Sequence, residues 1–520
     1  MQENLPAENE PQNRLFDIVE FDKFESLIVN KQPPALKPSR LRVNQVTQIK
    51  EFLRDRPRKC QSILVEHRYT DRAFMDEYKE FYATSFEQYT NYCSRLHFFE
   101  LSKNDLEKAL KKLARAVIRG NGAHSNYLTV CRKFSEANYL GFMVVKPLPA
   151  TRIGRTVIRH PNHKTNEGEK EKGFPCTRNY TAHVLGFELS VCGLPFQQQD
   201  GGMSACASTA LWASLSQYSE YEHFLVPSPA AITKFAGGHK TEFGRLIPQE
   251  RGLTTAQMCQ AMEGAGLSPY LIILGGDAVQ TRAMLYSVVR SGFAPILILR
   301  RTGEAHAVTV GGMILDGKPS VTQLEKITLH EQSGRLESLY INDDRLGPYR
   351  LAHLNGPSGI DIVLTNDVDP WQITHMMIPL HPKIRLAFNS LYAFANLAAD
   401  QLGLIADSHP DEIVKRKRQA TLEFWIMKAR NYRRHALFGQ HRLEWSAAEK
   451  LNALHNFSRY VGVVRFTDVS FGTIDILVDL TNTPRHMNVL LVLGRGRMTE
   501  WGQKLVGYLA HDLGASSLVD

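Results

Sequence analysis

Cysteine, histidine and aspartate side chains in three separate segments have the types and settings needed to act together on a carbonyl group. The first segment, residues 196–215, reads FQQQDGGMSACASTALWASL and holds Cys206 between a polar turn and a helical pattern. Ser204 is a suitable N-cap, which puts Cys206 in the first turn of the helix. Unpaired backbone N–H groups and the helix dipole stabilise a thiolate at that position. We therefore expect Cys206 to act as a nucleophile.

The second and third segments supply a base and a residue that orients it. Residues 295–315, PILILRRTGEAHAVTVGGMIL, read as a buried strand, a turn and a second strand that His306 opens. Residues 338–351, SLYINDDRLGPYRL, read as a strand that ends in a polar cluster containing Asp343. An imidazole at the start of a strand can face a helix end, and a neighbouring carboxylate can hold its second nitrogen. The expected roles are base for His306 and orienting residue for Asp343.

Glutamines upstream of the cysteine offer the remaining part of such a site. A side-chain N–H2 from Gln197, Gln198 or Gln199, with the backbone N–H of Cys206, would form an oxyanion hole. Each feature alone is ordinary, because a lone cysteine or histidine is commonly a core residue and an Asn-Asp-Asp cluster is commonly a turn. Their order, and the element that carries each one, favours a cysteine hydrolase.

Residues 195–350 resemble the papain-like cysteine peptidases, and most of all the double-glycine-leader peptidases that process bacteriocin precursors, with their stand-alone relatives. The similar features are QQD…SACASTALWASL, ERGLTTAQMCQAMEGAGLSPY, EAHAVTVGGM and LYINDD. The resemblance implies a domain built from a helix and an antiparallel sheet, with a nucleophile at Cys206, a base at His306 and an orienting residue at Asp343. It implies a peptide or isopeptide substrate, no cofactor and no metal, and it leans towards a bacterial origin.

The same resemblance selects one glutamine for the oxyanion hole. It implies Gln199, which lies seven positions before Cys206, whereas papain-like enzymes usually have this glutamine five or six positions before the nucleophile. Asp200 stands at the shorter spacing. A carboxylate pointing at the sulfur would disfavour the thiolate.

Composition restricts the class of protein without naming its substrate. The 520 residues are 43% hydrophobic and 22% charged, with a net charge of +9, which is typical of a globular protein. The seven cysteines form no CxxC pair, and this favours free thiols in a reducing compartment over a disulfide framework or zinc ribbon. The N-terminal residues lack an apolar signal core, and no apolar run is long enough to span a membrane. We therefore expect a cytoplasmic protein with no membrane partner.

Patterns along the chain predict an α+β protein in which the papain-like domain is flanked by other regions. We expect a disordered tail at 1–14, a mainly helical N-terminal domain at 15–137, a β-rich connector at 138–194 with a mobile loop at 160–175, the hydrolase domain at 195–366 and a C-terminal α/β domain at 367–520. Apolar spacing predicts helices over 42–55, 101–120, 383–407 and 411–435, with strands at VGVVRF, TIDILVDL and NVLLVLG.

Three alternatives to a peptidase stay open at this point. The same triad serves an amidase or acyltransferase, because an acyl-thioester can pass to water or to an amine. A binding module that keeps the fold without the chemistry is the second. The third is a nucleic-acid or acidic partner for the basic stretch Lys415–Arg418 with Arg430, Arg433 and Arg434, which is otherwise a solvated helix face.

Overall fold

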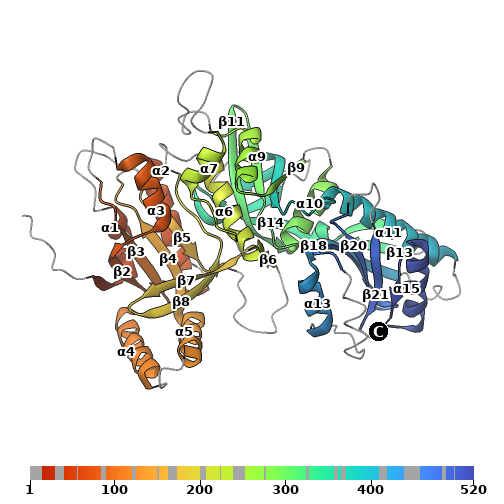
Figure 1. The fold of residues 1–520 in the computed structure, drawn as a ribbon, viewed down its shortest axis with the longest axis horizontal. Coiled ribbons are helices and arrows are strands. Elements are labelled where there is room, and N and C mark those ends of the chain that lie inside the picture. The colour runs from red at the N-terminus through yellow and green to blue at the C-terminus, as the bar shows by residue number, and fades with distance from the viewer. Residues whose placement is uncertain are drawn as a thin grey trace, which may run out of the picture.

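Three lobes, each containing a β-sheet, follow one another in a row from the N-terminal to the C-terminal part of the chain (Figure 1). The computed structural model describes residues 15–29, 40–55, 57–83, 89–119, 124–148, 151–161, 173–199, 206–222, 224–237, 252–274, 277–323, 327–355, 361–364, 370–408, 418–438, 457–482, 488–496 and 498–519. Helices and mainly antiparallel sheets are mixed throughout these residues, so the predicted α+β class is confirmed.

The N-terminal lobe is organised by a five-stranded antiparallel sheet in the order β1-β2-β3-β4-β5. Its strands are β1 (Phe16–Glu20), β2 (Ser62–Tyr69), β3 (Cys93–Phe99), β4 (Tyr139–Val145) and β5 (Ile153–Ile158). Its helices are α1 (Phe24–Val29), α2 (Arg40–Asp55), α3 (Arg72–Glu77), α4 (Lys103–Arg119) and α5 (His124–Asn138). Successive residues of β2 point to opposite faces, so Ile63 and Val65 pack with α1 and α2, while Leu64 packs with α4 and α5.

This architecture corrects the expectation of a mainly helical N-terminal domain. The predicted helices are present as α2 and α4, and Ser102 caps α4 by accepting a hydrogen bond from the backbone N–H of Asp105 at 3.3 Å. The strands between them are short and buried on both faces. Their apolar runs do not alternate with polar residues, and such runs are hard to distinguish from pieces of buried helix.

The connector region divides among different sheets. Its first strands, β4 and β5, complete the N-terminal sheet, while β7 (Arg178–Val184) and β8 (Phe187–Gly193) form a separate hairpin. Leu185 and Gly186 turn this hairpin with φ values of 51° and 77°, as a two-residue turn of this kind requires. A further strand, β6 (Gly173–Pro175), joins the central sheet. Most of the loop predicted to be mobile, 162–172, lies outside the described residues.

The central lobe contains an eight-stranded sheet that closes on itself, because β17 pairs with β10 as well as with its neighbours β16 and β9. The strands not yet given are β9 (Ser268–Ile273), β10 (Ile296–Arg301), β11 (Glu304–Leu315), β14 (Leu336–Asp343), β15 (Gly347–Asn355), β16 (Asp361–Leu364) and β17 (Trp371–Leu380). The helices of this lobe are α6 (Cys206–Glu222), α7 (Pro229–Phe235), α9 (Thr255–Gly264) and α10 (Ala278–Arg290). Because β17 belongs to this sheet, the central lobe extends past residue 366, where we had expected it to end.

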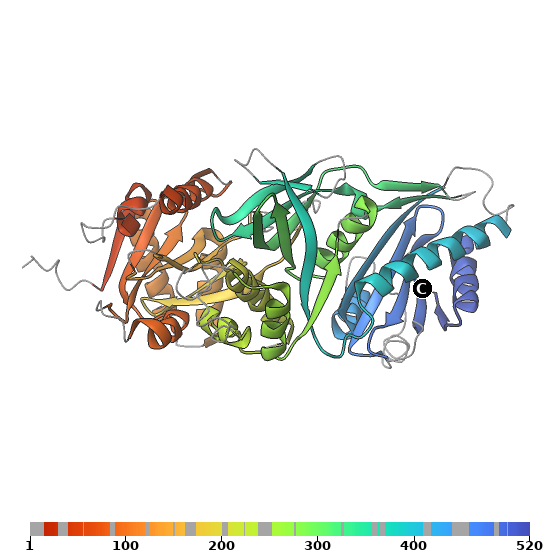
Figure 2. The same cartoon turned by 90° about the horizontal axis from the view of Figure 1, so that it is seen from above.

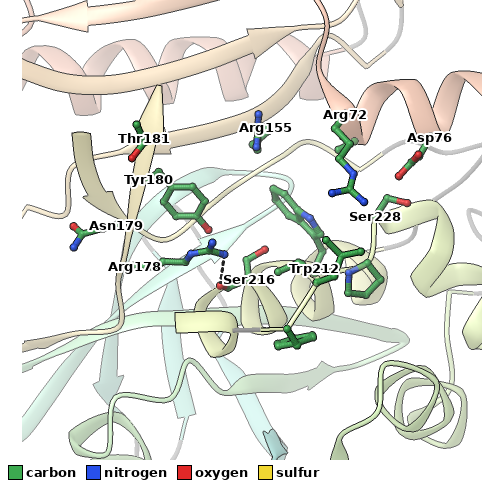
Figure 3. A pocket seen from close by; sticks show the side chains of 15 residues that line it. Arg72, Asp76, Arg155, Arg178, Asn179, Tyr180, Thr181, Trp212, Ser216 and Ser228 are labelled. Carbon is green, nitrogen blue, oxygen red and sulfur yellow. Dashed lines mark hydrogen bonds between the residues drawn. The ribbon is translucent and has the colours of Figure 1, made fainter. Parts of the chain in front are cut away.

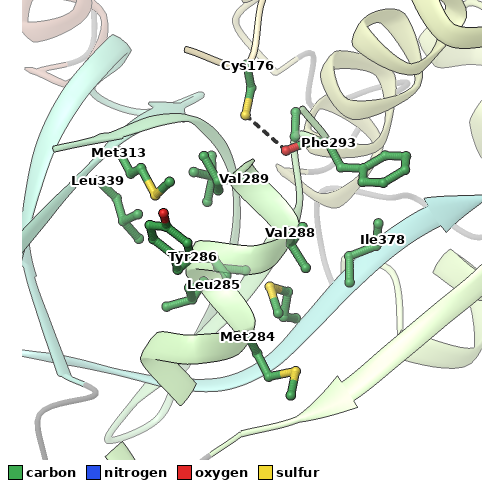
Figure 4. Packing of buried hydrophobic residues seen from close by; sticks show 14 of the residues in the cluster. Cys176, Met284, Leu285, Tyr286, Val288, Val289, Phe293, Met313, Leu339 and Ile378 are labelled. Carbon is green, nitrogen blue, oxygen red and sulfur yellow. Dashed lines mark hydrogen bonds between the residues drawn. The ribbon is translucent and has the colours of Figure 1, made fainter. Parts of the chain in front are cut away.

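Helix α10 forms part of the core of this lobe (Figure 4). Its residues Met284, Leu285 and Val288 are fully buried, with Met313 of β11 and Ile378 of β17 in the same cluster. Burying a large aliphatic side chain contributes about 1.5–3 kcal/mol. The core therefore fixes α10 against the same strands that carry the candidate site.

The C-terminal lobe is a seven-stranded sheet in the order β12-β13-β18-β19-β20-β21-β22. Its strands are β12 (Ser320–Gln323), β13 (Ile327–Glu331), β18 (Arg418–Lys428), β19 (Tyr460–Asp468), β20 (Gly472–Asp479), β21 (Val489–Arg495) and β22 (Ser517–Leu518). Helices α11 (Phe388–Ser408) and α15 (Glu500–Asp512) cover one face, and α13 (Ala429–Phe438) packs on the other. Figure 2 shows the long helix α11 lying across this sheet.

Two expectations for the C-terminal region are wrong. First, its sheet includes β12 and β13, which come from the segment we had assigned wholly to the hydrolase domain. Second, the helix predicted over 411–435 is a strand from Arg418 to Lys428 followed by α13. The strand is rich in β-branched and aromatic residues and is buried from both sides, which overrides the helical spacing. The three strands predicted from sequence are present as β19, β20 and β21.

No described helix has the length and apolar character needed to cross a membrane.

Candidate active site

Cys206 is the first residue of α6, as the sequence predicted for a nucleophile at a helix N-terminus. The helix is anchored deep in the central lobe because Leu211, Trp212 and Leu215 are buried. Thr309 of β11 also donates a hydrogen bond to the carbonyl of Ala210 at 2.9 Å. Cys206 itself is partly buried. The predicted cap Ser204 and the residue Asp200 lie outside the described residues.

His306 lies near the start of β11, next to the turn that joins this strand to β10. Strand β11 also pairs with β14, and the register sets Thr309 opposite Asn342. Continued towards the start of β11, this antiparallel register brings His306 beside the residues that follow Asn342. The sheet therefore explains why a histidine and two aspartates from distant parts of the chain meet.

Asp343 and Asp344 both face the same nitrogen of the histidine ring. Nε2 of His306 lies 3.1 Å from Oδ1 of Asp343 and 3.7 Å from Oδ1 of Asp344. The three side chains are almost wholly buried, at 3%, 0% and 3% exposure. The 3.1 Å contact is close enough for an ion pair, although its direction falls short of a hydrogen bond.

The Cys206 thiol lies near this group, because it is one of the neighbours that raise the pKa of His306. Since Nε2 faces the aspartates, a thiol that approaches the ring edge would meet Nδ1. Such an arrangement suits the nucleophile, base and orienting carboxylate of acyl-transfer chemistry. The structure brings together all three residues that the sequence singled out.

The charges of these groups depend on one another. Burial lowers the pKa of His306, but Asp343 outweighs this effect and, with the Cys206 thiol, raises that pKa to about 10. Burial would raise the pKa of Asp343, but His306 and Arg345 lower it to about 2. Burial raises the pKa of Asp344 to about 6. At neutral pH the ring is therefore protonated and Asp343 is ionised.

Two of the three candidate glutamines have side chains that form hydrogen bonds with other described residues. Nε2 of Gln197 donates to Oε1 of Glu77 at 3.3 Å, and Oε1 of Gln198 accepts from the backbone N–H of Ile153 at 3.3 Å. Gln199 is partly buried and is the last described residue before Cys206. Its role in the oxyanion hole stays a prediction.

Several residues around the site were not predicted. The ring of Trp371 lies 6.0 Å from that of His306, and the guanidinium groups of Arg301 and Arg345 lie over Trp371 at 4.3 Å and 5.3 Å. Gln45 of α2 donates a hydrogen bond to the backbone carbonyl of Asp344. The N-terminal lobe therefore supports the turn that carries the aspartates. No local sequence signal identifies Gln45, which is 299 positions away from its partner.

The same residues also offer a donor set for a metal ion. One nitrogen of His306 and one oxygen each from Asp343 and Asp344 lie within 4.8 Å of one another, and zinc or manganese accepts such ligands. A cation bound there would take Nε2 of His306 away from Asp343. A triad and a metal centre are therefore alternative uses of the same side chains.

The basic residues of the C-terminal region do not form the single basic helix face that the sequence suggested. Arg418 begins β18, while Arg430, Arg433 and Arg434 lie on α13, so these basic residues do not line one helix. Lys415–Lys417 lie outside the described residues. Arg495, at the end of β21, is buried and lies 3.2 Å from Asp475, so it belongs to the core of the C-terminal lobe.

Comparison with protein-family models and with curated proteins finds no match for this chain.

Proposed function

We propose that this protein is a papain-like cysteine hydrolase that cleaves a peptide or isopeptide bond through an acyl-thioester. The observation that carries the proposal is the 3.1 Å contact between His306 and Asp343, together with a Cys206 thiol near enough to raise the pKa of His306. Each residue lies on the kind of element that its role needs: a helix N-terminus, a strand start and a strand end.

The cysteine distribution agrees with a cytoplasmic location, because none of the seven cysteines forms a disulfide.

The geometry supports a two-step reaction. The Cys206 thiolate attacks the carbonyl carbon, and the protonated ring of His306 gives its proton to the leaving amine as the C–N bond breaks. His306 then takes a proton from water, which attacks the thioester, releases the acid and restores the sulfur. Asp343 keeps the ring oriented and stabilises its positive charge in both steps. Gln199 and the Cys206 backbone N–H would hold the oxyanion.

An electrophilic thiol probe tests the nucleophile without knowledge of the substrate. We expect Cys206 to be alkylated at least about tenfold faster than the other cysteines, since thiolate character controls the rate. His306→Ala should slow this labelling, while Cys259→Ala, which changes a partly buried cysteine away from the site, should leave it unchanged. Uniform labelling of the cysteines would leave a binding module as the better description.

Substrate assays then separate the remaining enzymatic alternatives. Cys206→Ala and Cys206→Ser should abolish turnover of the true substrate and leave the fold intact. Panels of peptide, isopeptide and simple amide substrates, with and without an added amine, distinguish a peptidase from an amidase or acyltransferase. Turnover that persists in Cys206→Ala would refute the assignment of the nucleophile.

A further inference from the structure

A cavity lies where the N-terminal lobe meets the helix that carries Cys206. It has a volume of about 470 Å³ and is bounded by α3, β5, β7, α6 and the segment 224–228. Figure 3 shows the charged and aromatic side chains that border it. We call it the arginine pocket and define it by Arg72, Arg155, Arg178, Tyr180, Trp212 and Ser216. Small-molecule sites usually have volumes of about 300–1,000 Å³, so the cavity is large enough for one ligand.

The lining of the arginine pocket holds more positive than negative charge. Three arginines line it, of which Arg155 is paired with Asp71, and Asp76 is the only acidic residue among the lining residues that the structure describes. Arg72 is exposed and forms no ion pair with any described residue. Guanidinium groups are the side chains best suited to phosphate and carboxylate, because their N–H donors bind two oxygens at once.

The other two arginines are held in place by contacts around the cavity. Arg155 donates to Asp71 at 2.7 Å and to the Tyr69 hydroxyl at 3.1 Å. Arg178 donates to the backbone carbonyl of Ser216 at 3.2 Å and also to the Ser219 hydroxyl. These contacts orient the guanidinium groups before any ligand arrives. Preorganised donors bind an anion with a smaller entropic cost.

Two buried polar atoms border the same arginines. Oη of Tyr180 is buried near Arg178 and Ser216, and the Arg178 guanidinium lies 5.1 Å from the Tyr180 ring. Nε of Arg155 is buried without a hydrogen-bond partner in the described part of the chain. Unsatisfied buried polar atoms are uncommon and commonly indicate a missing water, ion or ligand.

The lining of the arginine pocket also has an apolar part. It consists of Trp212 and the segment Phe224–Pro227, in which Leu225 is 70% exposed. A ligand that satisfies both the arginines and the apolar residues needs a doubly charged anionic group joined to a flat or apolar body. We propose that the arginine pocket binds an organic phosphate of nucleotide size, with its phosphate on the arginines and its ring against Trp212 and this segment.

The pocket is separate from the candidate catalytic group, although both involve α6. Ser216 lies ten positions after Cys206, which corresponds to about 15 Å along an α-helix. Binding there needs no turnover, so this inference is independent of the proposed hydrolase activity. Because the ligand would contact both the N-terminal lobe and α6, it would hold them together.

Calorimetric titration of the full chain with a nucleoside monophosphate, and separately with inorganic phosphate, tests the proposal. We expect saturable binding of the nucleotide and weaker binding of phosphate alone. Arg72→Ala should weaken nucleotide binding by about tenfold, since one charge-assisted hydrogen bond is lost. The matched control is Arg115→Ala, which removes an exposed arginine from α4 outside the pocket and should bind as the unaltered protein does.

Two further variants make the result decisive. Arg178→Lys keeps the charge but loses the forked geometry, and should also weaken binding. Trp212→Phe should weaken the binding of the nucleotide more than that of inorganic phosphate, because only the nucleotide has a ring that contacts Trp212. Equal affinity for nucleotide and phosphate would overturn the nucleotide assignment. Absence of binding at millimolar nucleotide, or binding unaffected by Arg72→Ala and Arg178→Lys, would overturn the site.

Discussion

Nε2 of His306 lies 3.1 Å from Oδ1 of Asp343, and both side chains are almost completely removed from solvent. The ion pair forms across two neighbouring strands, β11 and β14, so the sheet itself fixes the position of the histidine. A buried pair of this kind stabilises each partner's charge and depends on both being present. Cys206 lies near enough to contribute to the raised pKa of His306. The chemistry of the site therefore depends on the register of one strand pair.

Replacement of Asp343 by Asn should change the pH dependence of activity as well as its size. The carboxylate is what raises the pKa of His306 to about 10, so its loss should return that pKa towards the ordinary value near 6.5. A protonated ring is needed to release the amine, and the alkaline limb of the pH–rate profile should move to lower pH. We expect kcat/KM at neutral pH to fall by about tenfold or more. A lower rate with an unchanged alkaline limb would contradict the role given to Asp343.

Asp344→Asn should stabilise the protein above about pH 6. Burial raises the pKa of Asp344 to about 6 from its ordinary value near 3.9, so the folded state holds its proton more tightly than the unfolded state. Its contribution to stability therefore falls as pH rises from about 4 to about 6 and then stays constant. The shift corresponds to about 3 kcal/mol. Urea unfolding of both proteins at pH 4 and pH 7 should give a difference that grows with pH. If the difference in unfolding free energy between the two proteins were the same at pH 4 and pH 7, burial would not raise the pKa of Asp344 in the folded state.

Chelation distinguishes the triad from a metal centre formed by His306, Asp343 and Asp344. A cysteine hydrolase should keep its full activity after dialysis against EDTA in the presence of a thiol reductant, and should lose it on alkylation. The reductant matters, because oxidation of Cys206 would mimic loss of a metal. Activity that disappears on chelation and returns with zinc or manganese would favour the metal centre instead.

The sequence predicted the fold class and proposed residues for the candidate site, but not the strand pairings around them. Cys206, His306 and Asp343 are recognisable because the type of each residue matches a local pattern: small residues before a helix, a turn before a strand, a strand end. The approach of Asp344 to the same ring was not predictable. It depends on a register shift between Ile341 and Asp343 in the pairing of β14 with β15, and on the turn that follows. In a regular strand, adjacent side chains would point to opposite faces.

Long-range contacts account for most of what the sequence did not predict. Strands β12 and β13 belong by position to the hydrolase segment, but β13 pairs in parallel with β18, about ninety positions later in the chain. Trp371 packs near His306 because β17 returns to the central sheet. Such pairings depend on tertiary packing, which neither local propensity nor apolar spacing encodes.

Asp475→Asn should destabilise the C-terminal lobe strongly. The Asp475 carboxylate is fully buried and binds Arg465 at 2.6 Å, Arg495 at 3.2 Å and the Tyr432 hydroxyl at 2.8 Å. Removing its charge leaves two buried arginines without compensation, which typically costs about 3–5 kcal/mol. The matched control is Asp55→Asn, because Asp55 pairs with Arg54 at 3.0 Å on the surface, where water screens the interaction and such pairs contribute little to stability. Thermal unfolding monitored by calorimetry should show a large drop in the transition temperature for the first variant and little change for the second. Similar small effects in both would indicate that water reaches the buried arginines when the carboxylate is neutralised.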